Sequence, residues 1–292
     1  MAETERGPLD DRRAQRTLDT YYGMTLGCVT SDLRRSGWTF LPTRTESDPM
    51  ALLFGQRTLV HLVAPVSASA PPNALTSHLG QSSGQPGAGG AFGRGGVATL
   101  APDLRAGLRR ILLGAPPERL YTPAGVRTLD ALVRASSATP LASGSAAHLC
   151  VTYCAQSAFT PYLSPWLDWI EPLDDTSEMD PQGLQLLARF SGGVFVVWQR
   201  GHIIAWAGLR AHTPHVREIH LSDPLPEPLE SASAPGLRQA LFARATRAVF
   251  AAQRTPIFTY RADDLLSRRL ATTLGYRLYA DTSLYLTATT QQ

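Results

Sequence analysis

The chain has 292 residues, a formal net charge of +3 at neutral pH and 43% hydrophobic residues. This length and composition fit a globular protein with room for two domains of about 100 to 200 residues each. All 27 basic residues are arginine, which excludes chemistry that needs a lysine, such as a P-loop or a Schiff base. Because the net charge is small, we expect no nucleic-acid partner.

The sequence also predicts a protein without a membrane partner. Its first residues, "MAETERGPLDDRRAQR", are charged and do not resemble a signal peptide. No later segment reaches the roughly 18 apolar residues of a membrane span. Cys28, Cys150 and Cys154 are too few for a disulfide framework and suit a reducing compartment, so we expect a cytoplasmic protein. Cys150 and Cys154 alternate as in a buried strand, which favours packing over half of a metal site, and no metal is expected.

Residues 1–160 predict an N-terminal α+β domain. Its expected helices lie at 9–26, 31–35, 102–114 and 123–135, and its expected strands at 38–42 and 58–63. Residues 67–96 are rich in Gly, Ser and Pro and almost free of charge, which predicts a flexible loop. The Gly-x-Gly-x-x-Gly lookalikes in that loop follow no strand and open no helix, so a dinucleotide site is not expected there.

Residues 161–292 predict a second domain with a regular alternation of strands and helices. The expected strands are 167–173, 193–199, 202–209, 216–222, 257–260, 276–281 and 283–287, and the expected helices are 180–190, 236–253 and 264–274. A tight hairpin is expected at Arg200 and Gly201. The helix from residue 236 is expected to bury the side chains of Leu237, Leu241, Ala245, Ala248, Val249 and Ala252, and to leave Arg238, Arg244 and Arg247 in solvent.

The stretch "RADDLLSRRLATTLGYRLYAD" changes from helical to strand periodicity. Leu266, Leu270 and Leu274 stand at i, i+4 and i+8, which predicts that they form the buried face of a helix. Gly275 is the expected left-handed residue that ends this helix, and Tyr276 begins the strand that follows.

This stretch resembles a motif of the GCN5-related N-acetyltransferase (GNAT) family, Asn-x-x-Ser/Ala-x-x-Leu-(Tyr/Ala)-x-x-Leu-Gly-Phe/Tyr. The corresponding residues are Asp264, Ser267, Leu270, Ala271, Leu274, Gly275 and Tyr276. The order of elements between residues 167 and 287 resembles the same family. The resemblance implies an α/β (α+β) fold, with a mixed central sheet flanked by helices and preceded by a smaller α+β N-terminal domain.

The resemblance also implies acetyl-CoA as a co-substrate, held where the strands 216–222 and 257–260 splay apart, with its pyrophosphate at the N-terminus of the following helix. The cofactor-binding candidates are Ile219, Leu221, Gly236, Leu237, Arg238, Asp264 and Ser267. The phosphate turn departs from the family's pattern, because Ser233 replaces the leading Arg or Gln and Pro235 removes a donor. Glu227 and Glu230 add negative charge before it, and Arg238 is expected to compensate by facing the phosphates.

Acetyl transfer to an amine needs a base for the amine and an acid for the departing thiolate. The resemblance implies Glu218 as the base, and His220, on the same face of the strand, is the second catalytic candidate. Ala271 stands where the family often has a tyrosine acid, so the acid remains open. The acceptor is expected to be an amine-bearing small molecule or protein, and a homodimer is compatible with these features.

Besides nucleic-acid binding through the arginine-bearing helices, which the small net charge disfavours, two alternatives remain. The first is a non-catalytic GNAT-like domain that binds a ligand or a partner, which the altered turn, Asp264 and Ala271 all favour. The second is a metal hydrolase, because "HTPHVREIH" gathers His212, His215, Glu218 and His220. This second alternative is weaker, because the histidines lack the helix of a zincin motif. The N-terminal domain either shapes the acceptor site or is a decayed second copy of the same fold.

Overall fold

The computed structural model describes residues 6–43, 58–66, 95–101, 104–137, 140–142, 145–173, 181–222 and 234–287. Contacts divide the chain into two compact units. Unit 1 consists of Met1–Thr17, Thr152–Thr259 and Leu265–Arg277, and unit 2 of Leu18–Val151, Tyr260–Asp264 and Leu278–Gln292. Both units take segments from either side of residue 160, so the expected boundary at that residue does not separate them.

The sheet of unit 1 is mixed. Its strands are β5 (Ile170–Pro172), β6 (Val194–Gln199), β7 (His202–Ala211), β8 (Val216–Leu221) and β9 (Thr255–Arg261, of which the part up to Thr259 belongs to this unit). Their order is β9-β8-β7-β6-β5. Neighbours from β5 to β8 are antiparallel, whereas β8 and β9 are parallel. A mixed sheet flanked by helices is the expected fold class, and it is confirmed.

The turn between β6 and β7 is the tight hairpin that the sequence predicts. Arg200 and Gly201 both have positive φ, 52° and 79°. Two successive positive values are the signature of a type I′ turn, whose twist matches that of the strands it joins.

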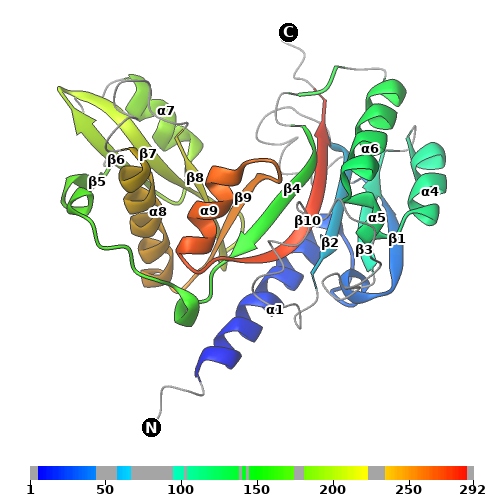
Figure 1. Cartoon of the computed structure of the whole chain (residues 1–292), viewed down its shortest axis with the longest axis horizontal. Coiled ribbons are helices and arrows are strands. Elements are labelled where there is room, and N and C mark those ends of the chain that lie inside the picture. Colours follow the sequence, from blue (N-terminus) through cyan, green and yellow to red (C-terminus); the bar gives the residue numbers. More distant parts are fainter. Residues whose placement is uncertain are drawn as a thin grey trace, which may run out of the picture. The chain divides into compact units, whose positions relative to one another are not determined.

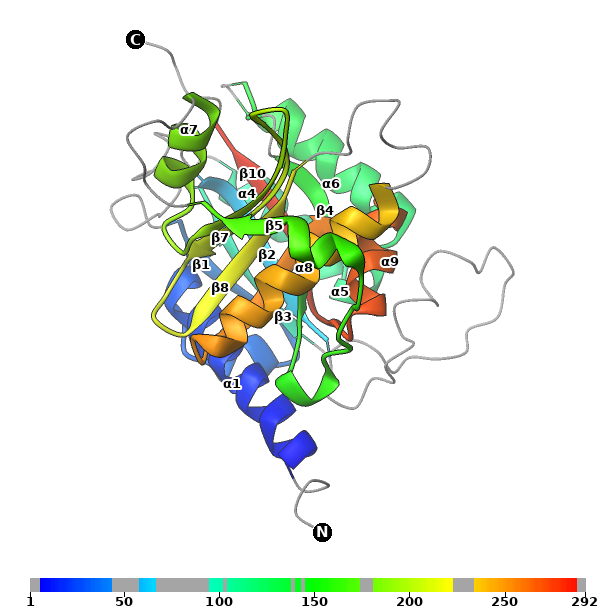
Figure 2. The same ribbon diagram turned by 90° about the vertical axis from the view of Figure 1, so that its left-hand side faces the viewer.

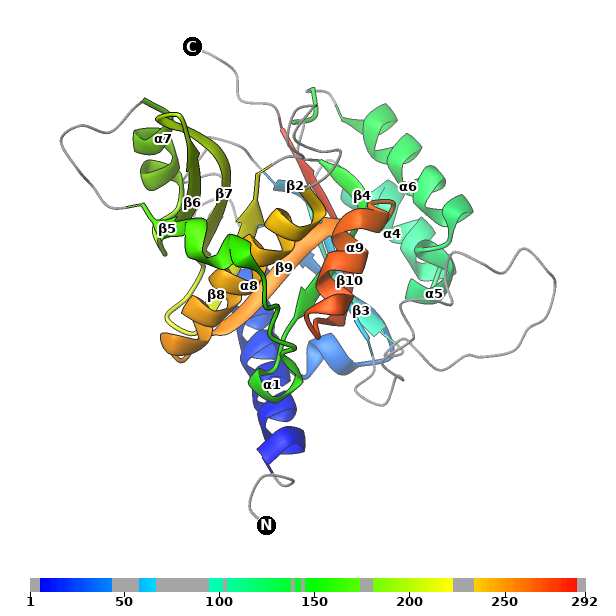
Figure 3. The same cartoon turned by 60° about the vertical axis from the view of Figure 1, so that its left-hand side comes forward.

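Two helices of unit 1 cover opposite faces of this sheet, as Figure 3 shows: α7 (Pro181–Arg189) and α8 (Ala234–Ala251). On the α7 side, Leu186 and Phe190 form a core cluster with Val194 and Val196 of β6. On the other side, α8 packs on β7 and β8 (Figure 2). Successive side chains of β6 therefore point alternately toward the α7 face and the α8 face of the sheet.

The prediction for α8 was right for most of the buried face and wrong for the arginines. Leu237, Leu241, Ala245 and Val249 are buried, but so are Ala240, Phe242, Ala243 and Thr246, whereas Ala252 is exposed. The three arginines are only partly exposed, and the Arg244 guanidinium lies 5.4 Å from the centre of the Phe195 ring. Because the 3-10 helix η3 (Pro165–Trp169) also packs on α8, little of this helix is left for solvent.

The helix α9 (Leu265–Thr273) buries a different face from the one predicted. Leu274, which follows the helix, is buried as predicted, but Leu266 is 68% exposed, and the buried positions within the helix are Ser267 and Ala271. These follow the same helical spacing, but they place small side chains inward, which allows the helix to approach its neighbours closely.

Gly275 ends α9 as the sequence predicts. Its φ is +87°, Tyr276 N–H donates to Ala271 O at 3.0 Å, and Gly275 N–H donates to Thr272 O at 3.1 Å. This pair of bonds is a Schellman motif. A methyl group on Gly275 would overlap the carbonyl oxygen of Ala158, so both the conformation and the space require glycine.

The strands of unit 2 are neighbours in the order β1-β3-β2-β10-β4. They are β1 (Gly37–Pro42), β2 (Thr58–Pro65), β3 (Gly95–Leu100), β4 (Ala146–Tyr153) and β10 (Arg277–Leu286). β1 and β3 are parallel, and β2 is antiparallel to both β3 and β10. The helices α4 (Arg105–Gly114), α5 (Pro117–Leu120) and α6 (Pro123–Ser136) contribute to its core (Figure 1). Before them, α1 (Arg6–Leu26) and the 3-10 turn η1 (Asp32–Arg34) open the chain.

The two closing strands predicted at 276–281 and 283–287 are one continuous strand, β10. The polar residues in the middle of β10 do not form a solvent-exposed turn; they are buried and hydrogen-bonded. Thr282 Oγ1 donates to Leu62 O at 2.6 Å, and Ser283 Oγ lies 3.4 Å from the Tyr121 hydroxyl. Polar side chains with such partners can stay inside a sheet. The last strand therefore pairs with β2, from the N-terminal part of the sequence.

Several predicted features lie wholly or partly outside the described residues. They are most of the loop 67–96 and the acidic and serine positions Glu227, Glu230 and Ser233.

The first strand predicted for unit 1 is shorter than expected. Residues 167–169, predicted as strand, are the end of η3, and β5 begins only at Ile170. In the described ranges, no helix combines the length and the apolar character needed to cross a membrane.

Replacing Gly275 by alanine tests its role as a helix end. We expect Gly275→Ala to lower the free energy of unfolding by about 2 to 3 kcal/mol, because the side chain strains the backbone and meets Ala158 O. Urea unfolding followed by circular dichroism measures this. Gly107→Ala in α4, where nothing lies within 4 Å of the new methyl group, is the control and should stabilise by about 0.5 to 1 kcal/mol. Equal effects of the two changes would contradict the assignment.

Candidate functional site

The parallel ladder between β8 and β9 stops partway along both strands. It joins Val216 to Thr255, Arg217 to Pro256 and Glu218 to Ile257, and no further pair follows. Both strands continue beyond it, β8 to Leu221 and β9 past Phe258. Among the residues that the structure describes, the second half of β8 therefore has a strand partner on its β7 side only.

The alternation of the antiparallel ladder fixes which backbone groups of β8 face the missing partner. Ser222 N–H donates to Trp206 O at 3.0 Å, so every second residue before it, His220 and Glu218, also bonds toward β7. The N–H and C=O groups of Ile219 and Leu221 point the other way. The Ile219 N–H lies in the last rung of the ladder, opposite Ile257. The Ile219 carbonyl and both backbone groups of Leu221 lie beyond that rung and can contact a ligand.

The first turn of α8 lies against aromatic side chains. A methyl group on Gly236 would sit 3.2 Å from the Tyr162 hydroxyl and 3.8 Å from Trp166 Nε1. Leu237 is buried in the core. Tyr162 and Trp166 come from the segment around η3, and the sequence analysis did not select them. The aromatic-rich run "TPYLSPWLDW" was the available signal.

Arg238 follows Gly236 by two residues and is incompletely paired. Its Nε is buried without a hydrogen-bond partner. Its Nη2 lies 3.5 Å from Ser267 Oγ on α9, which is a long contact. A guanidinium with spare donors at the start of a helix can bind an anion, because the helix N-terminus and the cation act together. Asp264, the remaining cofactor candidate, belongs to unit 2, where its N–H donates to Arg261 O.

The two catalytic candidates lie together in a buried hydrogen-bond network. Glu218 Oε2 accepts from His212 Nε2 at 2.8 Å and from His220 Nε2 at 3.0 Å. The Glu218 side chain is only 12% exposed. The Phe190 ring packs 5.4 Å from the His220 ring, over Gly208, where no side chain larger than hydrogen would fit. These contacts fix the position of the His220 ring.

The histidines also determine the protonation of Glu218. Burial alone would raise the pKa of Glu218, but the charge of His220 and the hydrogen bonds from His212 and His220 bring it well below its ordinary value. A carboxylate with so low a pKa is a weak proton acceptor. The network is better suited to orienting imidazoles, and His220 is the more exposed of the two that Glu218 holds.

The tyrosine of the C-terminal motif, Tyr276, is not placed to donate a proton. The Tyr276 hydroxyl is buried and lies 2.8 Å from Thr246 Oγ1, and burial raises the pKa of Tyr276 well above its ordinary value. Ala271 is buried too. His215, a member of the metal-hydrolase alternative, is exposed and bonds through its backbone N–H to Thr213 Oγ1 at 3.1 Å.

Comparisons with known proteins place this fold among solved structures. No protein-family model matches the sequence, and no curated protein matches it. Similar structures include a GNAT-family protein from Novosphingobium aromaticivorans, which is 21% identical over 52% of this chain and 68% of its own, with a TM-score of 0.39.

Two further similar structures carry related names. A GCN5-related N-acetyltransferase-like protein from Streptococcus suis is 17% identical over 53% of this chain and 67% of its own (TM-score 0.36). A GCN5-related N-acetyltransferase from Sphaerobacter thermophilus is 12% identical over 65% of this chain and 70% of its own (TM-score 0.37). These proteins carry the name of the family that the sequence resembles.

Substituting Glu218 tests the network through its pH dependence. The folded pKa of Glu218 is below its ordinary value of about 4.3, so the carboxylate stabilises the fold fully above that pH, and this contribution is lost as the pH falls toward the folded value. We expect Glu218→Gln to destabilise by about 2 kcal/mol at pH 6, where it loses charge-assisted hydrogen bonds, and by less at pH 3.5.

Urea unfolding at the two pH values measures this difference. Glu171→Gln on β5, where the side chain is exposed, is the matched control and should shift neither midpoint. A Glu218→Gln protein as stable as the parent at pH 6 would rule out the network as a source of stability.

Proposed function

We propose that unit 1 binds acetyl-CoA and transfers its acetyl group to an amine. The observation that supports this most directly is the end of the β8–β9 ladder after Glu218, which leaves the carbonyl group of Ile219 and the backbone groups of Leu221 beyond the ladder. The helix that follows β8 begins beside Tyr162 and carries Arg238 in its first turns. An extended amide chain that ends in a pyrophosphate is complementary to this arrangement.

Each part of the cofactor has a partner in the proposal. The two amides of the pantetheine arm pair with Ile219 and Leu221, as a peptide adds to an exposed strand. The pyrophosphate takes the N–H groups at the start of α8 and the guanidinium of Arg238, whose buried Nε would gain an acceptor. Tyr162 and Trp166 add a hydroxyl and an indole donor near Gly236.

In the proposed reaction the amine attacks the thioester carbonyl directly. His220 in its neutral form accepts the proton of the amine at Nδ1, while Glu218 holds the ring of His220 through its Nε2. The carbon–sulfur bond then breaks, and CoA leaves as the thiolate. In this scheme Glu218 is a positioning residue, and His220 takes the role of base that the family resemblance gave to Glu218.

A non-catalytic ligand-binding role is the second candidate. It is favoured by the low pKa of Glu218, by the buried Ala271 and by the buried hydroxyl of Tyr276. The two candidates share the cofactor site and differ in turnover. Release of the CoA thiol in the presence of a panel of amines separates them, because the non-catalytic protein would bind acetyl-CoA and release none.

Calorimetric titration with acetyl-CoA tests the cofactor site. We expect the parent protein to bind and Arg238→Ala to bind about tenfold more weakly, since a charge-assisted hydrogen bond contributes about 1.5 kcal/mol or more. Arg247→Ala, on the same helix and also partly exposed, is the control and should bind as the parent does. If the parent protein gave no heat of binding at millimolar acetyl-CoA, the proposal would be wrong. If Arg238→Ala bound as tightly as the parent, Arg238 would not belong to the site.

Substituting His220 tests the chemistry separately from binding. We expect His220→Gln to lower kcat about 100-fold, which is the usual loss when a proton acceptor is removed, and to leave acetyl-CoA affinity within twofold. His215→Gln is the control, because His215 is exposed and outside the network. A rate unchanged in His220→Gln would assign the proton transfer elsewhere.

A further inference from the structure

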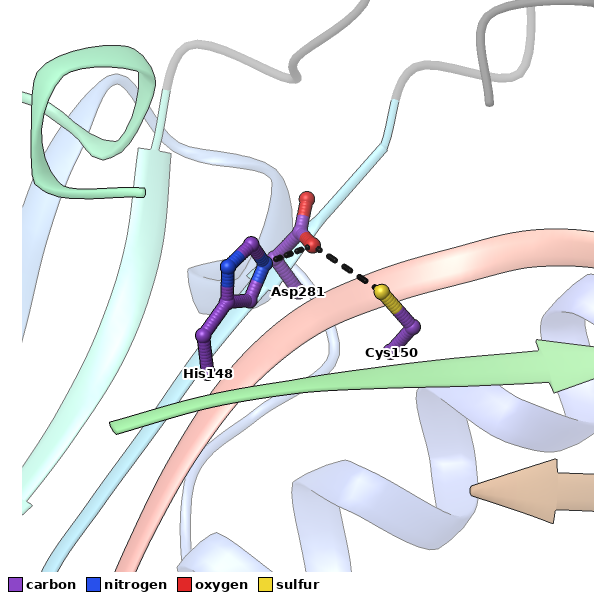
Figure 4. Close-up of side chains that lie close together, drawn as sticks. All are labelled: His148, Cys150 and Asp281. Atoms are coloured by element: carbon purple, nitrogen blue, oxygen red, sulfur yellow. Dashed lines mark hydrogen bonds and ion pairs between the residues drawn. The ribbon is translucent and has the colours of Figure 1, made fainter. Parts of the chain in front are cut away.

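A second group of reactive side chains lies in unit 2, outside the site described above. Among the residues that the structure describes, His148, Cys150 and Asp281 bring ligand-type atoms within 4.8 Å of one another. Figure 4 shows the three side chains converging, with Oδ1 of Asp281 between the His148 ring and the sulfur of Cys150. This oxygen lies 2.6 Å from His148 Nε2 and 3.7 Å from Cys150 Sγ.

The sheet of unit 2 brings these residues together. His148 and Cys150 are two residues apart on β4, so their side chains share one face. Asp281 lies on the neighbouring strand β10. The ring of Tyr121 packs 4.8 Å from the His148 ring and restricts its orientation. The group therefore stands on two adjacent strands, which position side chains more firmly than loops do.

We propose that His148, Cys150 and Asp281 bind one divalent transition-metal ion of the zinc class. Imidazole nitrogen, thiolate sulfur and carboxylate oxygen are the three ligand types that zinc takes in proteins. Magnesium and calcium prefer oxygen ligands throughout, so a site with one sulfur and one nitrogen selects against them.

The spacing of the ligand atoms can be compared with that of a tetrahedral site. Metal–ligand bonds of about 2.0 to 2.3 Å place neighbouring ligand atoms roughly 3.3 to 3.7 Å apart in a tetrahedron. The separation of Cys150 Sγ and Asp281 Oδ1, at 3.7 Å, already fits. The hydrogen bond from His148 must open by about 0.7 Å to reach the separation expected for this geometry. Movement of the His148 ring can provide this, because His148 is 20% exposed, whereas Asp281 is 5% exposed.

The charges of the site balance when the metal binds. The Cys150 thiol gives its proton to solvent and forms the metal–sulfur bond, while His148 binds as a neutral imidazole and Asp281 as a carboxylate. Two negative ligands and a divalent ion make a complex without net charge, which lowers the cost of holding it among buried side chains. Nothing is oxidised or reduced. The more exposed side, at His148, leaves a fourth position for water.

This assignment differs from the sequence-based expectation, which considered Cys150 only together with Cys154 and expected no metal. Cys154 belongs to unit 1, and its sulfur donates to Ala155 O at 3.3 Å. The partners of Cys150 are instead His148, two residues before it, and Asp281, 131 residues after it. The first of these was visible as "HLC" in the sequence, and the second requires the strand pairing.

Titration of the metal-free full-length protein with cobalt(II) and zinc(II) tests the proposal. Cobalt reports a bond to a thiolate by a charge-transfer band in the near-ultraviolet, and zinc added afterwards should displace it. We expect one equivalent of cobalt to produce the band in the parent. Cys150→Ser should abolish the band, and Cys150→Ser, Asp281→Asn and His148→Gln should each weaken zinc binding at least tenfold in calorimetry.

Two matched controls separate this site from the rest of the chain. Cys154→Ser removes a buried thiol from the end of the same strand, and Cys28→Ser removes the third cysteine; both should bind the metals as the parent does. Circular dichroism shows whether each variant is folded. The proposal is overturned if the parent gives no thiolate band, if Cys150→Ser and Asp281→Asn bind zinc like the parent, or if His212→Gln weakens zinc binding and Cys150→Ser does not.

Discussion

The end of a hydrogen-bonded ladder inside a sheet is the constraint on which the candidate site of unit 1 depends. Backbone N–H and C=O groups away from water need partners, and a strand that loses its neighbour halfway leaves a row of them unpaired. In unit 1 this happens after Glu218 and Ile257. The parallel direction of β8 and β9 requires a crossover between them, and α8 is that crossover. The open edge and the helix start therefore arise from one topological feature.

Buried polar groups follow a similar rule in both units. Glu218 in unit 1 is held by two imidazoles, and Asp281 in unit 2 by one imidazole and a thiol. An unpaired carboxylate would be costly at either position. The hydrogen bonds that lower the free-energy cost of burying these carboxylates also fix the positions of the surrounding histidines. Ordered imidazoles are useful both for proton transfer and for metal binding.

The sequence predicted the elements of unit 1 well, because their signals are local. The hairpin at Arg200 and Gly201 and the helix end at Gly275 each follow from the conformational preferences of a few neighbouring residues. The continuity of β10 was missed, because its polar middle is satisfied by partners on β2 and by Tyr121. His212 and Glu218 are only six residues apart in the sequence, so a local pattern could have indicated their hydrogen bond. The contact between Gly236 and Tyr162 depends on tertiary packing that no local pattern contains.

The interleaving of the two units in the chain has a consequence for how the protein can be divided. The backbone passes from one unit to the other after Thr17, Val151, Thr259, Asp264 and Arg277. The unit that contains β8 and α8 consequently needs three separate stretches of sequence, and the other unit needs the remaining three. A fragment that begins after residue 160 holds the strands β5 to β9, but it lacks the segment Met1–Thr17 of the same unit. During synthesis on the ribosome, unit 1 has its full set of segments once Arg277 has been added, whereas unit 2 still needs the rest of β10.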